Sequence, residues 1–233
     1  MIDETKFAFV DTETCGLDPE RNPIWEVAVI IDGVEHHWFQ RLPLVVFNPI
    51  DDRPRWYPPT AVVGELPRGI ALVPWELGYR RPHLDQWVVD NTGIMERYDH
   101  DAALNETVST GRFANLTKGR ILVGAVPSFD EERMRRQFRQ HIDRQAIQFP
   151  WHYQLIDVET LAAGYLTSMR HAGVNMVGEW GREVPYPDPM LWPLDSDQIS
   201  KALGLTPSKD GGRHTALADA RWAREVFMAV MGG

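Results

Sequence analysis

The sequence predicts an α/β fold with a mixed five-stranded sheet and helices on both faces. Two observations support this prediction. Three β-rich runs come first, and an Asp-Gly hairpin signal stands between the second and the third, which indicates an antiparallel three-strand meander. Two more β-rich runs then alternate with helical segments, a pattern that is typical of parallel strands joined by helical crossovers.

The meander is expected over residues 7–11, 25–31 and 36–41. The first run, FAFVD, is short, apolar and aromatic and ends in a charge, as a buried strand often does. Asp32 and Gly33 stand between the second and third runs. An Asp-Gly pair tolerates the positive φ angles of a type I′ turn, so these two residues predict a β-hairpin.

The later elements follow from hydrophobic periodicity and from helix boundary signals. The strands are expected at 119–123 and 153–157, and the helices at about 84–91, 101–116, 130–142, 159–169, 195–203 and 214–230. Gly93 should close the first helix. In the helix 130–142, Met134, Phe138 and Ile142 are expected on the buried face, and Arg133, Arg135, Arg136 and Arg139 largely on the solvated one.

Two proline- and glycine-rich stretches, about 42–83 and 173–193, lack sustained periodicity and are predicted to be irregular insertions. Long irregular loops in compact domains are often functional. Trp56 and Trp75 in the first insertion favour a partly ordered flap over a disordered linker. No clean linker divides the chain, so we expect a single domain over residues 1–233.

Composition narrows the class of protein. Cys15 is the single cysteine, so the sequence gives no sign of a disulfide-forming compartment. No window reaches the roughly 18 apolar residues of a membrane span, and the N-terminus lacks a signal-peptide pattern, so we expect a cytoplasmic protein. The net charge of −9 argues against a general nucleic-acid coat protein, but it is compatible with an enzyme that handles a few phosphates at one site.

Asp11 and Glu13 lie two residues apart at the end of the first predicted strand. In an extended backbone their side chains point to the same face, where they can bind one cation. Alone, this spacing is more often a solvated strand end. Asp157 and Glu159 have the same spacing after another strand, and we interpret them as structural, with Glu159 complementing the positive end of a helix.

His214 and Asp219 are the next candidates. The pattern HTALAD places an imidazole at or just before a helix start and a carboxylate about one turn inside the helix. A purely structural interpretation, with His214 as a helix cap and Asp219 as a solvated helix residue, explains this segment about as well as a functional one. Asp130 opens another helix, and stabilisation of that helix start would be the preferred explanation if Asp130 stood alone.

Together, three segments resemble the exonuclease motifs of the DEDDh 3′→5′ exonucleases. This superfamily contains proofreading exonucleases and oligoribonucleases and has a ribonuclease-H-like fold. The segments are FVDTETCGL (9–17), VGAVPSFD (123–130) and HTALADA (214–220), in the order of the family and with His in the third motif. The resemblance covers about residues 7–41 and 119–230. The second motif departs from the family, which usually has a polar pair such as His-Asn where this chain has residues 125–127 (AVP).

The resemblance implies a catalytic centre with two divalent cations, Mg²⁺ or Mn²⁺. Asp11, Glu13 and Asp219 would hold the cation that carries the attacking water. Asp11 would also bridge to the second cation, to which Asp130 would contribute directly or through water. His214 would act as the general base.

The resemblance also implies contacts with the end of the substrate. The backbone around Thr12 and the Thr14 side chain would meet the terminal 3′-hydroxyl group, and Leu17 would wedge against the last base. Phe129, retained beside Asp130, is the remaining predicted substrate contact.

The sequence thus predicts a metal-dependent 3′→5′ exonuclease that releases nucleoside 5′-monophosphates from single-stranded DNA or frayed 3′ ends. An oligoribonuclease-like RNA exonuclease stays open, and so does a catalytically silent ribonuclease-H-like binding module, although the intact set of five catalytic residues argues against the latter. No polymerase segment is present, so a proofreading role would require a polymerase in trans. The compact chain with its insertions resembles bacterial or phage members, and a phage protein would act in the host cytoplasm.

Overall fold

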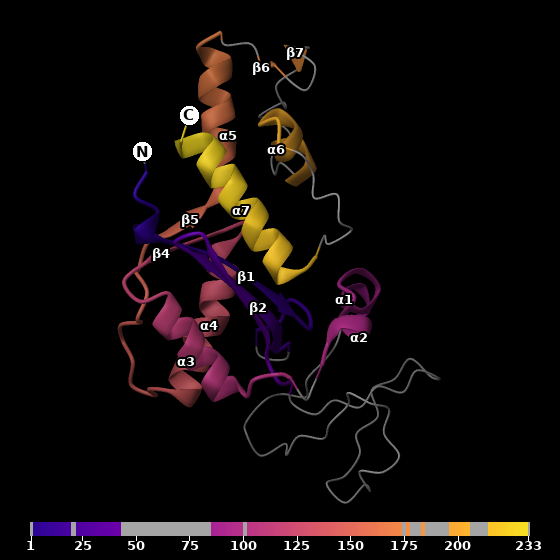
Figure 1. The fold of residues 1–233 in the computed structure, drawn as a ribbon, viewed down its shortest axis with the longest axis vertical. Helices are drawn as coiled ribbons and strands as arrows, with labels where there is room; N and C mark the ends of the chain where they lie inside the picture. Colours follow the sequence, from indigo (N-terminus) through magenta and orange to yellow (C-terminus); the bar gives the residue numbers. More distant parts are fainter. Residues whose placement is uncertain are drawn as a thin grey trace, which may run out of the picture.

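The computed structural model describes residues 2–19, 22–42, 85–99, 102–173, 176–177, 183–184, 196–205 and 214–232. Five strands form one mixed sheet in the order β3-β2-β1-β4-β5 (Figure 1). Strand β1 (Phe7–Thr14) pairs antiparallel with β2 (Ile24–Ile31) and parallel with β4 (Ile121–Gly124). Strand β3 (Val34–Phe39) extends the antiparallel side, and β5 (Leu155–Asp157) extends the parallel side. The predicted mixed sheet is confirmed.

The predicted hairpin between β2 and β3 is also confirmed. Asp32 and Gly33 both have positive φ angles, of 52° and 75°. A type I′ turn requires this conformation at both central residues, and it matches the twist of the two strands. The turn therefore sets the register of β3 against β2.

The helices and short elements are η1 (Glu4–Lys6), α1 (Gln86–Asn91), α2 (Ile94–Arg97), α3 (Glu106–Leu116), α4 (Pro127–His141), α5 (Val158–His171), α6 (Ser196–Ala202) and α7 (Ala216–Met231). Helix α3 begins later than predicted, because Asn105 caps it by accepting the N–H of Val108. Helix α4 begins three residues before Asp130, because Pro127 at its first position is preorganised for a helix. Among the described residues, no helix is long and apolar enough to cross a membrane.

Parts of both predicted insertions lie outside the described residues, including 43–84 and most of 173–193. One correction concerns the second insertion. Two short strands, β6 (Met176–Val177) and β7 (Glu183–Val184), pair there as a separate antiparallel ladder, so this stretch is not wholly irregular.

Helices cover both faces of the five-stranded sheet, as predicted (Figure 1). Side chains of β1 alternate between two cores. Phe9 packs on the side of α5, α6 and α7, and Ala8 and Val10 pack on the side of α3 and α4. Because α7 lies directly against the Phe9 face, the next residues of β1 on that face are placed beside the start of α7.

The prediction for α4 needs two corrections. Met134 is fully buried as expected, but Ile142 is 46% exposed because it follows the last turn of the helix as its C-cap. Arg133, expected on the solvated face, is only 4% exposed. Its guanidinium group lies inside the protein between α4 and the turn that follows β1.

Candidate active site

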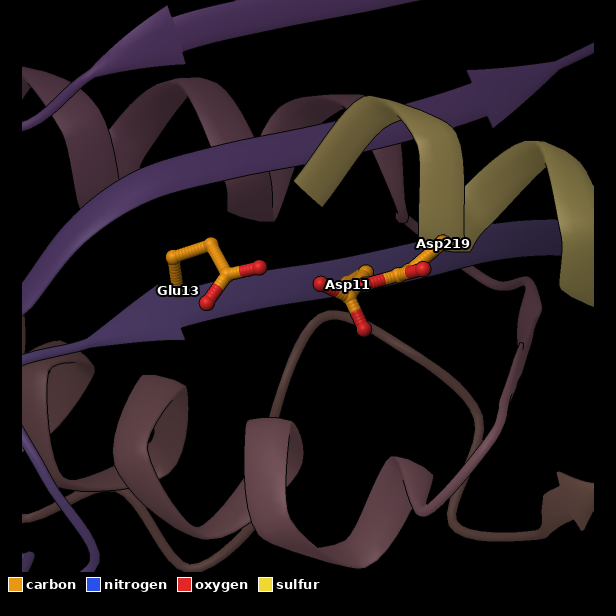
Figure 2. Close-up of side chains that lie close together, drawn as sticks. All are labelled: Asp11, Glu13 and Asp219. Atoms are coloured by element: carbon orange, nitrogen blue, oxygen red, sulfur yellow. The ribbon is translucent and has the colours of Figure 1, made fainter. Parts of the chain in front are cut away.

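Three carboxylates meet where β1 passes beneath the start of α7. One oxygen each of Asp11, Glu13 and Asp219 lies within 4.8 Å of the other two. Figure 2 shows Asp11 between the other two side chains, with Asp219 reaching down from α7. We call these three residues the carboxylate cluster. The predicted pairing of the first and third motifs in space is therefore realised.

Local structure explains how the cluster forms. Asp11 and Glu13 are two residues apart on an extended strand, so they share one face, the face that Phe9 presents to α7. Thr215 caps α7 by accepting the N–H of Ala218 at 3.1 Å. This cap fixes Asp219 in the first turn of α7, one turn inside the helix as the sequence indicated.

Burial and mutual repulsion make this cluster unfavourable when all three groups are charged. Burial raises the pKa of Asp11 well above its usual range, and the charges of Asp130 and Asp219 raise it further. Burial, Asp219 and Glu26 raise the pKa of Glu13 to about 8, although Arg97 opposes them. A divalent cation would relieve this repulsion. Oxygen donors without thiolate or imidazole suit Mg²⁺ or Mn²⁺, so the residues fit the predicted cofactor.

Asp130 lies next to the cluster but is oriented differently. It stands in the first turn of α4, is buried, and accepts a hydrogen bond from the Thr12 hydroxyl at Oδ1 over 2.5 Å. Burial raises the pKa of Asp130 to about 7, while the Thr12 hydrogen bond lowers it. Its charge acts on Asp11, so Asp130 is close enough to contribute to the electrostatics of the cluster. Its role as a ligand of a second cation stays a prediction.

The structure places the predicted substrate contacts around the end of β1. The hydroxyl of Thr14 donates to the carbonyl of Gly16 at 2.8 Å, so it must exchange this bond to reach a substrate. Leu17 projects from the following turn and is 79% exposed. Phe129 is half-buried on α4, beneath the guanidinium group of Arg133.

His214 lies just before α7 and outside the carboxylate cluster. It has a positive φ of 65°, which is uncommon for a residue with a side chain and turns the chain into the Thr215 cap. Its imidazole contacts the indole of Trp87 edge to face, with 5.3 Å between ring centroids. Trp87, on α1, is 54% exposed. Trp87 carries no role that the sequence predicts, because nothing local marks a tryptophan there as a neighbour of a histidine 127 positions away.

A buried ion pair stands behind Glu13. Glu26 on β2 is directly opposite Glu13 in the β1–β2 register and is 1% exposed. Its carboxylate pairs with the guanidinium group of Arg97 and, at 2.7 Å, with Nε2 of His37. Arg97 also lies over the ring of Trp25. A glutamate inside the apolar run IWEVAVII was an available signal for this network, since a buried carboxylate needs a partner.

Asp157 and Glu159 behave as predicted for a structural pair. Asp157 accepts the N–H of Thr160 at 3.0 Å and caps α5, and Glu159 lies in the first turn of that helix. A carboxylate at this position stabilises the helix start. The same two-residue spacing therefore occurs in two structural settings. At Asp157 and Glu159 it stabilises a helix start, and at Asp11 and Glu13 it places two carboxylates in the cluster.

The raised pKa of Glu13 predicts an unusual pH dependence for the metal-free protein. Between its unfolded pKa of 4.5 and its folded pKa of about 8, the folded state holds a proton that the unfolded chain has released. This contribution to stability is complete below the unfolded pKa and is lost as the pH rises through the folded pKa. We expect the midpoint of thermal unfolding in EDTA to fall between pH 5 and pH 8 more steeply for the parent than for Glu13→Gln. A steeper fall in the variant would contradict the prediction.

This sheet order, with helices on both faces and carboxylates along the central strand, defines a ribonuclease-H-like fold with an acidic site. Solved structures of exonuclease I share this fold. For the E. coli enzyme in complex with a dT13 oligonucleotide, the TM-score is 0.57 and the identity 18%, over 97% of this chain and 41% of that chain. For exonuclease I from Methylocaldum szegediense, the TM-score is 0.55 and the identity 19%, over 97% of this chain and 40% of that chain.

The zinc-bound form of the E. coli exonuclease I complex with single-stranded DNA gives similar values. Its TM-score is 0.57 and its identity 20%, over 96% of this chain and 40% of that chain. The chain thus spans about two fifths of the length of these proteins. No protein-family model and no curated protein sequence matches the chain. The comparison confirms the predicted ribonuclease-H-like fold.

Proposed function

We propose that the protein is a metal-dependent 3′→5′ exonuclease that acts on single-stranded DNA and releases nucleoside 5′-monophosphates. The carboxylate cluster carries this proposal, because β1 and α7 bring together Asp11, Glu13 and Asp219 from opposite ends of the chain. The fold is shared with exonuclease I structures that hold single-stranded DNA, which supports a DNA substrate.

The carboxylates of the site would hold two cations, with Asp11 shared between them. Asp11, Glu13 and Asp219 would hold the first divalent cation, and Asp11 with Asp130 the second. Bound cations would supply charge stabilisation on the phosphate and a nucleophile at neutral pH. Asp130 would turn from its bond with Thr12 toward the site, or act through a water molecule.

His214 would remove a proton from the attacking water. An imidazole titrates near neutral pH, whereas a carboxylate ordinarily does not. The exposed position of His214 leaves it accessible to solvent, and its ring contact with Trp87 restricts the orientations that it can adopt. Cleavage on the O3′ side of each phosphate leaves that phosphate on the released nucleotide, which gives 5′-monophosphates.

Two other functions are less well supported. An oligoribonuclease-like enzyme would use the same cluster on RNA, but three of the similar structures hold single-stranded DNA. A catalytically silent binding module would gain nothing from three clustered carboxylates whose mutual repulsion raises the pKa of Asp11 and Glu13. DNA cleavage is therefore the function that we test first.

The test is cleavage of 5′-labelled single-stranded DNA and RNA oligomers, resolved on a denaturing gel. With Mg²⁺ or Mn²⁺ we expect a DNA ladder that shortens one nucleotide at a time, and EDTA should abolish it. A 3′-labelled DNA should release its label as a mononucleotide from the first cleavage. Intact DNA with binding retained would favour the silent module, and a ladder from RNA alone would favour the oligoribonuclease-like enzyme.

A further inference from the structure

The turn that follows β1 has a fixed backbone and an exposed apolar side chain. We call residues Cys15–Pro19 the Leu17 turn. Asn22 donates to the carbonyl of Cys15 at 3.2 Å and accepts the N–H of Asp18 at 2.8 Å. Gly16 has a φ of 150°, and a Cβ there would lie 2.9 Å from the Asn22 amide group. These bonds hold the backbone while Leu17 points outward with 79% of its surface exposed.

Arg133 on α4 also holds this turn. Its Nη2 donates to the carbonyl of Leu17 at 2.6 Å, and its Nη1 donates to the carbonyl of Phe129 at 3.2 Å. The guanidinium carbon lies 3.4 Å from the centroid of the Phe129 ring. A second arginine of the same helix, Arg136, donates to the carbonyl of Pro19 at 2.5 Å. Two arginines of α4 therefore form hydrogen bonds with two carbonyl groups of the turn.

Two features of the hydrogen bonds between Arg133 and the Leu17 turn favour a functional role: their location, and the burial of a charged group that they require. Leu17 is four residues beyond Glu13, and Arg133 is three residues beyond Asp130, so the contact joins the two elements that carry these carboxylates. Burying a guanidinium group is unfavourable unless its hydrogen bonds are made inside the protein. Here the buried guanidinium group of Arg133 donates to the backbone of a surface turn, and the side chain of that turn's Leu17 is exposed. A general stabilising role would not require the leucine to face solvent.

We propose that Arg133 is a positioning residue that fixes the Leu17 turn against α4 and presents Leu17 as a preformed apolar contact for the terminal base of a DNA strand. The ligand in this inference rests on the proposed function. A contact fixed before binding spares the entropy of ordering a loop when the strand arrives. Arg133 thus acts on substrate affinity through Leu17, without touching the reacting atoms.

A double-mutant cycle tests this proposal. The readouts are KM and kcat on a 5′-labelled dT oligomer, together with the Kd of a fluorescein-labelled dT oligomer in EDTA. We expect Leu17→Ala and Arg133→Met each to raise KM and Kd about tenfold, the size of one base contact. For Leu17→Ala, kcat should change less than about twofold. Because both variants remove the same contact, the double variant should bind no more weakly than Leu17→Ala.

Two further variants keep the test decisive. Arg135→Met changes an arginine on the same helix that pairs with Glu131 instead of the turn, so its KM should match the parent. Gly16→Ala displaces the turn from the Asn22 side without changing α4, and it should reproduce the rise in KM. If Arg133→Met does not fold, Arg133→Lys, which keeps the charge but cannot donate to both carbonyl groups, takes its place in the cycle.

Additive effects in the cycle, or an unchanged KM in a folded Arg133→Met protein, would overturn the proposal. If the parent cleaves DNA while the cycle is additive, this inference fails and the proposed function stands. If the parent binds the oligomer without cleaving it, the proposed function fails, and the cycle measured by Kd still decides the role of Arg133. A parent that neither binds nor cleaves the oligomer overturns both.

Discussion

Replacing Asp219 with asparagine is expected to reduce kcat/KM for DNA cleavage by at least about 100-fold. Asparagine keeps the shape of the side chain but removes the charge that α7 contributes to the carboxylate cluster. Stabilisation by a bound cation is worth several kcal/mol in such reactions, and about 2.7 kcal/mol already corresponds to a factor of 100. The measurement is the rate of ladder formation on labelled DNA, accompanied by titration with Mn²⁺, which the variant should bind more weakly.

The same substitution should not harm the fold. The charge of Asp219 raises the pKa of both Asp11 and Glu13, so its removal relieves repulsion in the metal-free protein. The midpoint of thermal unfolding in EDTA should therefore match or exceed that of the parent. This trade between stability and function is typical of active sites.

Asp157→Asn is the matched control for Asp219→Asn. Asp157 and Glu159 have the spacing of Asp11 and Glu13, but Asp157 caps α5, and asparagine is an equally good N-cap. We expect this control to cleave DNA within about twofold of the parent, as expected for a surface cap outside the site. Cleavage by Asp219→Asn at the parental rate would remove the carboxylate cluster from the mechanism.

Replacing His214 with alanine is expected to lower kcat by about 10²–10⁴-fold, the usual contribution of a general base. The affinity for Mn²⁺ should be retained, because His214 is not part of the carboxylate cluster. The rising limb of the pH–rate profile that a general base produces on losing its proton should disappear in the variant.

His152→Ala provides the control for this second prediction. His152 stacks on Tyr153 before β5 and takes no part in the proposed chemistry. Its replacement should leave both kcat and the pH profile as they are in the parent. Weak binding of Mn²⁺ by His214→Ala would instead make His214 a metal ligand, and an unchanged kcat would leave the site without its proposed base.

Much of the fold was predictable because its signals are local. The apolar run of β1, the Asp-Gly turn and the helix periodicities depend on residues close together in the chain, and the structure confirms them. The start of α4 was placed three residues late, although Pro127 was a usable signal. Periodicity also placed Ile142 in the core, because it does not report where a helix ends.

The burial of charged groups was less predictable. Arg133 follows the helix periodicity of a solvated residue, but the turn after β1 packs over it and supplies the carbonyl group that it needs. Glu26 stands out in an apolar strand, yet its partner Arg97 is 71 positions away. Pairing of buried charges is decided by which elements meet in space, and that depends on the packing of the whole sheet.

By itself, the sequence determined the order and type of the strands and the five residues most suited to metal-dependent hydrolysis. Only the tertiary structure decided how those five residues are arranged. It brings Asp219 to Asp11 and Glu13, ties Asp130 to Thr12 and sets His214 against Trp87. The physical reason is the range of the interactions. Backbone propensities and side-chain alternation act over a few residues, whereas hydrogen bonds and repulsion between carboxylates depend on distances that the packing of α4 and α7 on the sheet creates.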